Sequence, residues 1–258
     1  MKATQLIEAN PSIPIHRQLV PEGTPETLEV SEFFCDTIQG EGVTTGRPSA
    51  FLRLKGCTLD CDYCDTKLIY QKGEVYSFEE LFRAMQEVDL INKFAKGQHL
   101  VITGGSPLKQ QEELIDFLIA FIQKYGFKPI IEIENECTIA PEIPLINLVD
   151  VWNNSPKLAN SRNPYNERYK PYIIKQLSKL DNSWFKFVIE NSVDWVEIEH
   201  DYITPGLIRR NQIILMPRGE NQDMLLVHGK LTIQMAIREN VRYCTREHIV
   251  LWNNQTGV

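Results

Sequence analysis

The chain has 258 residues, of which 43% are hydrophobic and 24% are charged, and its formal net charge at pH 7 is −7. This length and composition predict a soluble globular protein with one full core. They argue against a bilayer-spanning protein, because no apolar run approaches the roughly 20 residues that a crossing needs. An acidic chain also lacks the basic face that a large nucleic-acid-binding surface requires.

Residues 1–28 are expected to form an extended N-terminal arm rather than a targeting segment. Glu8 and the prolines Pro11, Pro14 and Pro21 interrupt this stretch, and it contains no apolar run of the kind found in a secretory signal. The six cysteines are too few to staple a chain of this length with disulfides, and free thiols need a reducing compartment. The sequence therefore predicts a cytoplasmic protein that does not attach to a membrane.

Segments with strand and helix patterns alternate along the rest of the chain. The predicted strands are 28–38, 50–55, 100–103, 129–133, 148–152, 184–189, 212–216 and 248–252. The first predicted helix follows Ser77, which opens an S-x-x-E capping box. Apolar spacing places the other helices at 114–122, ending at Gly126, and at 172–177, 193–203 and 231–239. The alternation predicts an α/β fold with a parallel sheet in one domain, 29–258.

Unusual residues gather where the predicted strands end. Five groups each come directly after a strand, namely the loop 57–64, Gly104 to Pro107, Glu134, Ser155 to Lys157, and Met216 with Pro217. In a parallel barrel or partial barrel, the carboxyl ends of the strands meet at one rim. We therefore expect these five groups to share one ligand site.

The strongest chemical signal is the spacing C-x3-C-x2-C formed by Cys57, Cys61 and Cys64. Cysteine thiolates are the usual ligands of iron–sulfur clusters, and a four-iron cluster normally takes four of them. Three cysteines in one loop would leave one iron without a protein ligand. An open iron can hold a small molecule, which favours a site for chemistry over a site for electron storage.

A structural zinc site is the alternative interpretation of these cysteines. Zinc takes four tetrahedral ligands, and the fourth could come from Cys35, Cys137, Cys244 or one of five histidines. None of these stands at the paired spacing that zinc modules show. A non-catalytic zinc or nucleic-acid-binding module therefore remains the alternative to an enzyme.

Several other residues also have an ordinary structural interpretation. Gly104 with Gly105 could form a tight turn, and Ser155 to Lys157 could be a plain loop. Glu41 could be a solvated loop charge, and Thr66 could cap the next helix. Arg53 lies in an otherwise apolar strand, where a buried cation needs either an internal carboxylate or an anionic substrate.

Taken together, these motifs closely resemble the 7-carboxy-7-deazaguanine synthase family of radical S-adenosylmethionine (SAM) enzymes. The resemblance spans about Val30 to Val258 and includes specific Q-G-E-G and C-D-T signatures. The segments that carry it are Thr37 to Gly42, Gly46 to Pro48, Phe51 to Cys57, Cys61 to Thr66, Thr103 to Gly105, Thr138 to Pro141, Ser155 to Lys157, Leu215 to Pro217 and His248 to Trp252.

The resemblance implies a partial (β/α)6 radical SAM barrel and a set of site residues. A [4Fe-4S] cluster would be held by Cys57, Cys61 and Cys64, and its open iron would chelate the amino and carboxylate groups of SAM. Thr66 would be a ligand of Mg2+. The residues implied to line SAM are Tyr63, Cys64, Asp65, Gly105, Ser155, Pro156 and Lys157, with Tyr63 beside the adenine. Those implied to contact the substrate are Ile38, Gln39, Gly40, Arg53, Thr103 and Val258.

The resemblance also implies a reaction and partners. The substrate would be 6-carboxy-5,6,7,8-tetrahydropterin, and a deoxyadenosyl radical would start its conversion to 7-carboxy-7-deazaguanine with loss of ammonia. The product would enter queuosine-type or other 7-deazaguanine modification, without direct binding of nucleic acid. A homodimer and an electron donor such as flavodoxin or ferredoxin are also implied. Another radical SAM enzyme, such as a glycyl-radical activase, is the alternative within the same superfamily.

The sequence departs from the family pattern in two places. The family usually has T-G-G-E-P where this chain has Ser106 in place of Glu, and E-T-N-G-T where residues 134–138 read E-N-E-C-T. The family Glu accepts hydrogen bonds from the amino group of SAM, and a neutral, shorter Ser cannot replace its charge. We hypothesise that Glu134 or the open iron compensates.

Overall fold

The computed structural model describes residues 26–253. Its centre is a nine-stranded sheet with the order β3-β1-β2-β4-β5-β6-β7-β8-β9. The strands are β1 (Thr27–Ile38), β2 (Pro48–Leu54), β3 (Glu74–Ser77), β4 (His99–Gly104), β5 (Ile130–Asn135), β6 (Val151–Asn154), β7 (Ser183–Ile189), β8 (Ile213–Pro217) and β9 (Arg242–Tyr243).

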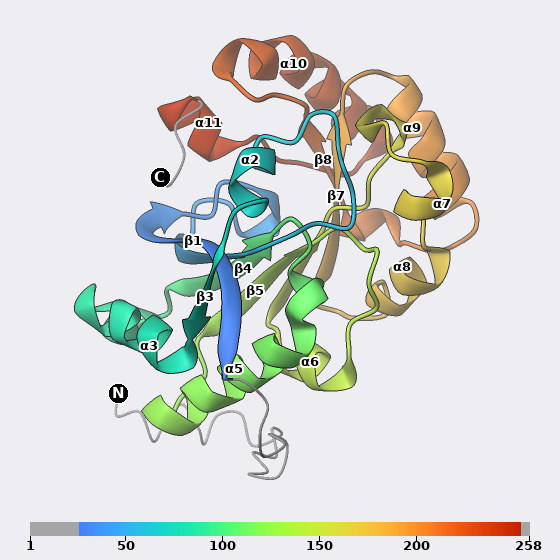
Figure 1. Cartoon of the computed structure of the whole chain (residues 1–258). Helices are drawn as coiled ribbons and strands as arrows, with labels where there is room; N and C mark the ends of the chain where they lie inside the picture. Colours follow the sequence, from blue (N-terminus) through green and yellow to red (C-terminus); the bar gives the residue numbers. More distant parts are fainter. Residues whose placement is uncertain (1–25, 254–258) are drawn as a thin grey trace.

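Most of the sheet is parallel. All the pairs from β2 to β9 in the sheet order run parallel, whereas β1 pairs antiparallel with β2 and with β3. Figure 1 shows the helices arranged around the outside of this curved sheet. The predicted α/β fold with a largely parallel sheet is confirmed, and the two antiparallel strands are an addition at one edge.

The helices connect successive strands. The α-helices are α2 (Lys67–Tyr70), α3 (Phe78–Glu87), α4 (Leu90–Ala95), α5 (Gln111–Tyr125), α6 (Ile143–Leu148), α7 (Tyr165–Arg168), α8 (Pro171–Leu177), α9 (Val193–Glu197), α10 (Gln222–Glu239) and α11 (Glu247–Trp252). Short 3-10 or π segments are η1 (Gly42–Thr44), η2 (Pro107–Gln110), η3 (Ala159–Ser161), η4 (Ile198–Ile203) and η5 (Arg210–Gln212).

Two local signals for helix ends are confirmed. The hydroxyl of Ser77 accepts a hydrogen bond from the Glu80 amide, and the Glu80 carboxylate accepts one from the Ser77 amide at 2.7 Å, so α3 begins with a capping box. Helix α5 ends at Gly126, whose φ of 72° is the left-handed conformation that glycine adopts without a Cβ clash.

The C-terminal part of the fold differs from the prediction. The predicted strand at 248–252 is wrong, because these residues belong to helix α11, in which Ile249 is buried and Leu251 is exposed. Helix α10 begins at Gln222 rather than at 231, and Asn221 caps it by accepting a hydrogen bond from the Met224 amide at 3.0 Å.

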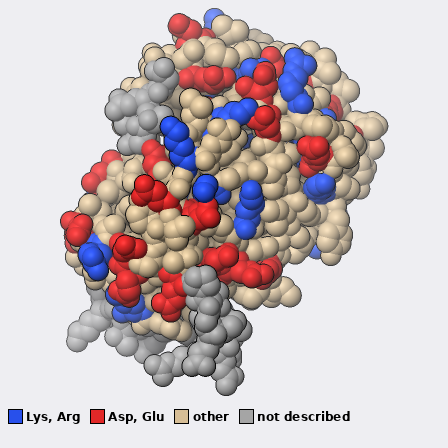
Figure 2. Space-filling view, viewed as in Figure 1, with Lys and Arg blue, Asp and Glu red and all other residues tan. Residues whose placement is uncertain are grey.

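The core lies between the sheet and the helices around it. Large side chains such as Phe82, Phe117, Phe121, Trp152 and Phe187 are fully buried there, and such burial is the main favourable contribution to folding. No helix within residues 26–253 is both long and apolar enough to cross a membrane. On the face seen in Figure 2, Lys and Arg side chains stand among Asp and Glu side chains rather than forming a continuous basic surface.

The expected domain boundary falls near the start of the described structure. The predicted arm, 1–28, lies almost wholly outside the described residues, and Thr27 and Leu28 already belong to β1. Strand ends also shift slightly at the rim, because Glu134 lies inside β5, and Met216 and Pro217 are the last residues of β8 rather than the first after it.

Candidate active site

A cavity of about 450 Å³ opens at the carboxyl ends of the parallel strands. It brings together nearly all of the predicted site residues. The predicted residues that line it are Ile38, Gln39, Gly40, Arg53, Cys57, Cys61, Tyr63, Cys64, Asp65, Thr66, Thr103, Gly105, Ser155 and Lys157. Pro156 is buried next to Ser155 without lining the cavity, and Val258 lies outside the described residues.

The cysteine loop offers its sulfur atoms to the cavity with hydrogen-bond donors beside them. The Asn163 amide Nδ2 donates to Cys61 Sγ at 3.3 Å. The Leu59 backbone amide and the Ser106 hydroxyl donate to Cys57 Sγ at 3.4 and 3.5 Å. Hydrogen bonds to the sulfurs are a standard way in which proteins hold and tune an iron–sulfur cluster, so the loop fits such a group.

Of the candidate fourth zinc ligands within residues 26–253, His248 lines the cavity, but its Nε2 lies 3.9 Å from Glu41 Oε1 and it forms no metal-binding group with the cysteines. Cys35, Cys137 and Cys244 are not among the residues that line the cavity. Within residues 26–253, no group of three or more His, Cys, Asp or Glu side chains is arranged around a single metal ion. A four-iron cluster is wider than one ion, so its three ligands do not need to converge in that way.

The glycine pair after β4 lets two loops pack directly together. A Cβ atom on Gly105 would lie 2.4 Å from both Cys57 Cβ and the Gly56 carbonyl oxygen, and one on Gly104 would lie 2.4 Å from the Leu54 carbonyl oxygen. Real Cβ atoms do not approach so closely, and only glycine avoids the clash. The pair is therefore more than a turn, because it holds the β4 loop against the cysteine loop.

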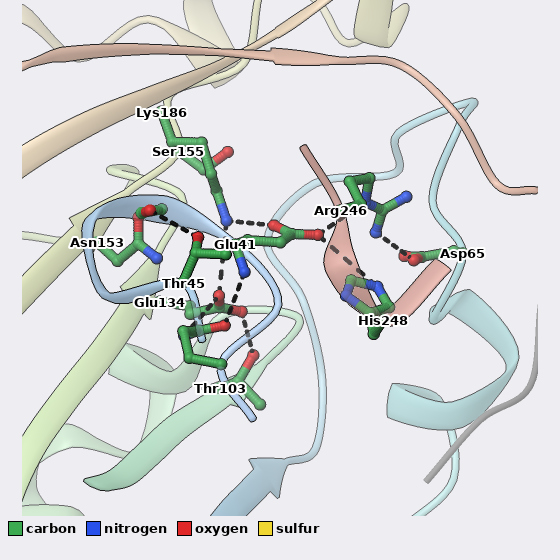
Figure 3. Close-up of polar contacts among 12 residues, drawn as sticks. Glu41, Thr45, Asp65, Thr103, Glu134, Asn153, Ser155, Lys186, Arg246 and His248 are labelled. Atoms are coloured by element: carbon green, nitrogen blue, oxygen red, sulfur yellow. Dashed lines mark hydrogen bonds and ion pairs between the residues drawn. The ribbon is translucent and has the colours of Figure 1, made fainter. Parts of the chain in front are cut away.

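Glu41 is the centre of a buried ion-pair network (Figure 3). One carboxylate oxygen accepts a hydrogen bond from Lys186 Nζ, and the other accepts from Arg246 Nε at 2.7 Å. Arg246 also donates to Asp65 in the cysteine loop at 2.5 Å. The interpretation of Glu41 as a solvated loop charge is wrong, since its side chain is only 11% exposed.

The charges of this network are fixed at neutral pH. Burial would raise the pKa of Glu41 and of Asp65, but the cations beside them hold the pKa of Glu41 well below its usual range and lower the pKa of Asp65. Burial and the charge of Arg246 lower the pKa of His248, despite the nearby Glu41. The carboxylates are therefore ionised at pH 7, while the imidazole is neutral.

Replacing Glu41 by Gln is expected to destabilise the protein. Two buried cations would lose their shared carboxylate, which should cost about 3 kcal/mol of unfolding free energy at pH 7. Because the pKa of folded Glu41 lies below its unfolded value, this contribution is complete above about pH 4.5 and is lost as the pH falls through the folded pKa.

Urea unfolding of the wild type and Glu41→Gln at several pH values measures this effect, and the difference should shrink in acid. Glu79→Gln is the control, because its ion pair with Lys124 is exposed and such pairs contribute about 0 to 1 kcal/mol. Equal stability of the wild type and Glu41→Gln at pH 7 would contradict the network's role.

Other residues around the cavity also form paired polar contacts. Arg53 Nε lies 3.1 Å from Glu32 Oε2, so the buried cation has an internal carboxylate as partner. The bond uses Nε and leaves the two terminal nitrogens of the guanidinium for an anion. Thr103 donates its hydroxyl hydrogen to Glu134 Oε2 at 3.0 Å, and Gln39 Nε2 donates to Glu132 Oε1 at 2.7 Å.

Several residues that line the site or hold its lining residues in place were not predicted from the sequence. Lys186 lies in the apolar strand β7, and Glu132 lies in the apolar strand β5. Lys186 and Glu132 each place a charge in an apolar strand, as Arg53 does. The same sequence signal could therefore have identified both residues. Arg246 has no such local signal, because it precedes α11 in a polar connection.

Comparisons with known proteins agree with this geometry. A family model described as a 4Fe-4S single cluster domain matches residues 38–151. The chain is 31% identical over 237 residues to the 7-carboxy-7-deazaguanine synthase of Pyrobaculum aerophilum, covering 89% of this chain and 97% of that protein. The protein of the same name from Halobacterium salinarum is 28% identical over an alignment of 261 residues that covers 92% of this chain and 95% of that protein.

A solved structure supports the fold. The crystal structure of QueE from Escherichia coli superimposes with a TM-score of 0.63 and 24% sequence identity, over 86% of this chain and 95% of that chain. At this level of identity the likeness concerns the arrangement of strands and helices.

Proposed function

Because this chain belongs to the 7-carboxy-7-deazaguanine synthase family, we propose that it converts 6-carboxy-5,6,7,8-tetrahydropterin to 7-carboxy-7-deazaguanine with loss of ammonia, for queuosine or other 7-deazaguanine biosynthesis. The observation that carries this proposal is the shared cavity, which is lined by three thiols and by the cation Arg53. It can therefore hold an iron–sulfur cluster and an anionic substrate together.

The cysteine loop supplies the cofactor site. A [4Fe-4S] cluster on Cys57, Cys61 and Cys64, together with SAM, supplies radical chemistry when bound. The residues proposed to surround SAM are Tyr63, Cys64, Asp65, Gly105, Ser155, Pro156 and Lys157. Lys157 donates to Ser155 Oγ at 2.9 Å, and the Arg218 guanidinium lies 5.3 Å from the centre of the Tyr63 ring, so both polar groups and an aromatic face border this part of the cavity.

The substrate is proposed to lie against Arg53. The planar guanidinium can bind a carboxylate with two hydrogen bonds, and Glu32 fixes the orientation of the guanidinium. Ile38, Gln39, Gly40 and Thr103 border the same space. A radical reaction needs a tightly held substrate, and these polar groups are suited to fix the pterin ring. The proposed contact from Val258 concerns a residue outside the described structure.

One experiment tests the proposed reaction. The reconstituted protein is incubated without oxygen with SAM, Mg2+, a reductant and 6-carboxy-5,6,7,8-tetrahydropterin, and the products are identified by mass spectrometry. We expect a compound with the mass of 7-carboxy-7-deazaguanine. SAM cleavage without that product would overturn the proposal and favour a different radical SAM enzyme.

Thr66 is the proposed Mg2+ ligand. It occupies the N-cap position of α2, but its side chain makes no capping hydrogen bond there. Its hydroxyl lies 3.7 Å from Cys64 Sγ, and the residue lines the cavity. A hydroxyl oxygen is a suitable hard ligand for Mg2+, so its placement supports this role rather than a capping role.

Replacing Thr66 by Val is expected to raise the Mg2+ concentration for half-maximal activity by about 10-fold or more, because one oxygen ligand of the ion is lost. Thr66→Ser retains the hydroxyl and should resemble the wild type. Steady-state rates over a range of Mg2+ concentrations measure the effect. If the activity of Thr66→Val depends on the Mg2+ concentration as the wild type does, Thr66 is not a ligand of the metal.

The proposed partners are a second subunit and an electron donor. Helices α10 and α11 carry exposed apolar side chains, namely Leu226, Val227, Ile237 and Leu251, and a second subunit can cover such side chains. Their exposure supports the proposed homodimer, which light scattering of the purified protein would detect. Flavodoxin or ferredoxin is the proposed class of electron donor.

A further inference from the structure

Glu136 carries a buried carboxylate oxygen without a hydrogen-bond partner. This residue follows β5 directly and lines the cavity, although its side chain is buried. Its Oε1 accepts hydrogen bonds from the Thr138 hydroxyl at 2.5 Å and the Thr58 hydroxyl at 3.2 Å. Its Oε2 is buried with no partner among the described residues. A buried charged oxygen is costly to leave unpaired, so we expect a ligand to supply its donor.

This carboxylate lies close to the first cysteine of the loop. The Thr58 hydroxyl is 3.0 Å from the Ser106 hydroxyl, and the Ser106 hydroxyl is 3.5 Å from Cys57 Sγ. These contacts between neighbouring side chains place Glu136 near the sulfur of Cys57. Glu136 lines the same cavity as the three cysteines, where a molecule chelated to the cluster would lie.

The other carboxylates that line the cavity already have partners or face solvent. Glu32 pairs with Arg53, and both Glu41 and Asp65 pair with Arg246.

Glu134 was the hypothesised compensating group, but both of its oxygens are engaged. One accepts from the Thr103 hydroxyl at 3.0 Å, and the other lies 3.5 Å from Lys186 Nζ. Glu220 also lines the cavity but is only partly buried, so water can serve its oxygens. Among residues 26–253, Glu136 is the buried lining carboxylate that has an oxygen left to accept a hydrogen bond.

We propose that Glu136 binds the amino group of SAM and so supplies the carboxylate that the family pattern places at position 106. SAM carries one amino group, and when that group is bound to the open iron it keeps two N–H donors, which suit a buried carboxylate. Ser106 cannot take this role, because its hydroxyl is uncharged and is held between Thr58 and Cys57 in a side chain only 1% exposed. The two departures from the family pattern thus compensate for each other. This inference rests on the proposed function.

The test measures SAM binding to the reconstituted cluster protein under anaerobic conditions. Glu136→Gln keeps the shape of the side chain and removes its charge, so it should bind SAM about 10- to 100-fold more weakly than the wild type. The SAM-dependent change in the electron paramagnetic resonance spectrum of the reduced cluster should need correspondingly more SAM. Glu142→Gln is the matched control, because Glu142 is exposed in the following loop and should bind SAM like the wild type.

A SAM analogue without the amino group identifies the atom that Glu136 recognises. The wild type and Glu136→Gln should bind this analogue with equal affinity, since the group that distinguishes them is absent. Adding Ser106→Glu to Glu136→Gln should restore affinity for SAM. If Glu136→Gln does not retain iron, Glu136→Asp is measured instead. Glu136→Asp should lose affinity for SAM but not for the analogue. Equal losses of affinity for both ligands would overturn the inference.

The outcomes separate this inference from the proposed function. If the wild type forms 7-carboxy-7-deazaguanine while Glu136→Gln binds SAM as tightly as the wild type, the role of Glu136 is wrong and the function stands. If the wild type with an intact cluster does not bind SAM, both are wrong.

Discussion

Replacing Cys61 by Ser is expected to remove the iron–sulfur cluster and to abolish turnover. Cys61 is a buried thiol that receives a hydrogen bond from Asn163, and a serine hydroxyl is a poor ligand for iron. The reconstituted wild type should contain about four irons per chain and absorb near 400 nm, whereas the variant should contain few. Conversion of the pterin should fall by about 1,000-fold or more, because the cofactor carries the difficult chemistry.

Cys35→Ser is the control for the loss of a thiol as such. Cys35 lies in β1 and does not line the cavity, so this variant should retain iron and activity. Iron analysis, the visible spectrum and product formation are measured on the same anaerobic preparations. A Cys61→Ser protein that still holds about four irons and forms product would contradict the assignment of the loop.

Replacing Arg53 by Lys is expected to lower kcat/KM for the pterin by about 100-fold. The loss corresponds to one or two charge-assisted hydrogen bonds to the substrate carboxylate, which a compact ammonium group cannot form in the same paired geometry. The affinity for SAM should not change. Steady-state kinetics with varied pterin concentrations, together with SAM binding, separates the two effects.

Arg83→Lys is the matched control, because Arg83 is exposed on α3. Glu32→Gln provides a second comparison: it leaves the guanidinium in place but removes the carboxylate that orients it, so it should cause a smaller loss than Arg53→Lys. An unchanged kcat/KM for Arg53→Lys would show that the substrate carboxylate does not bind Arg53.

Local patterns predicted the elements that have clear end signals. The capping box at Ser77 and the glycine at Gly126 act within one helical turn, so neighbouring residues determine them. The parallel strands are also local, since each is an apolar run followed by a loop. Because the strand ends of a parallel sheet coincide, the rim could be predicted without knowing any contact across it.

The prediction failed where the pattern was ambiguous. The segment His248 to Trp252 is short and apolar, and such a run fits a strand or a helix equally well. In the fold it is a helix because Ile249 turns inward while Val250 and Leu251 stay exposed. The tertiary environment, and not the local sequence, determines whether this segment forms a helix or a strand.

Most of the ion-pair network could not be predicted from the sequence, because its partners lie far apart along the chain. Glu41 and Lys186 are 145 residues apart, and no local pattern states which distant charge will meet which. The signal that a buried cation in an apolar strand needs a partner was used for Arg53 and would have applied to Lys186. It can identify the need for a partner but not the partner itself.

Arg246 meets Glu41 and Asp65 across 205 and 181 residues of chain. At about 5 to 20 residues per second, the ribosome makes the three thiols roughly 10 to 40 s before it makes the arginine that anchors their loop. We therefore expect iron to be delivered after translation has ended. An mRNA truncated before the codon for Arg246 would encode every cluster ligand. In its product the cysteine loop would lack the ion pair with Arg246, and its thiols would be open to oxidation.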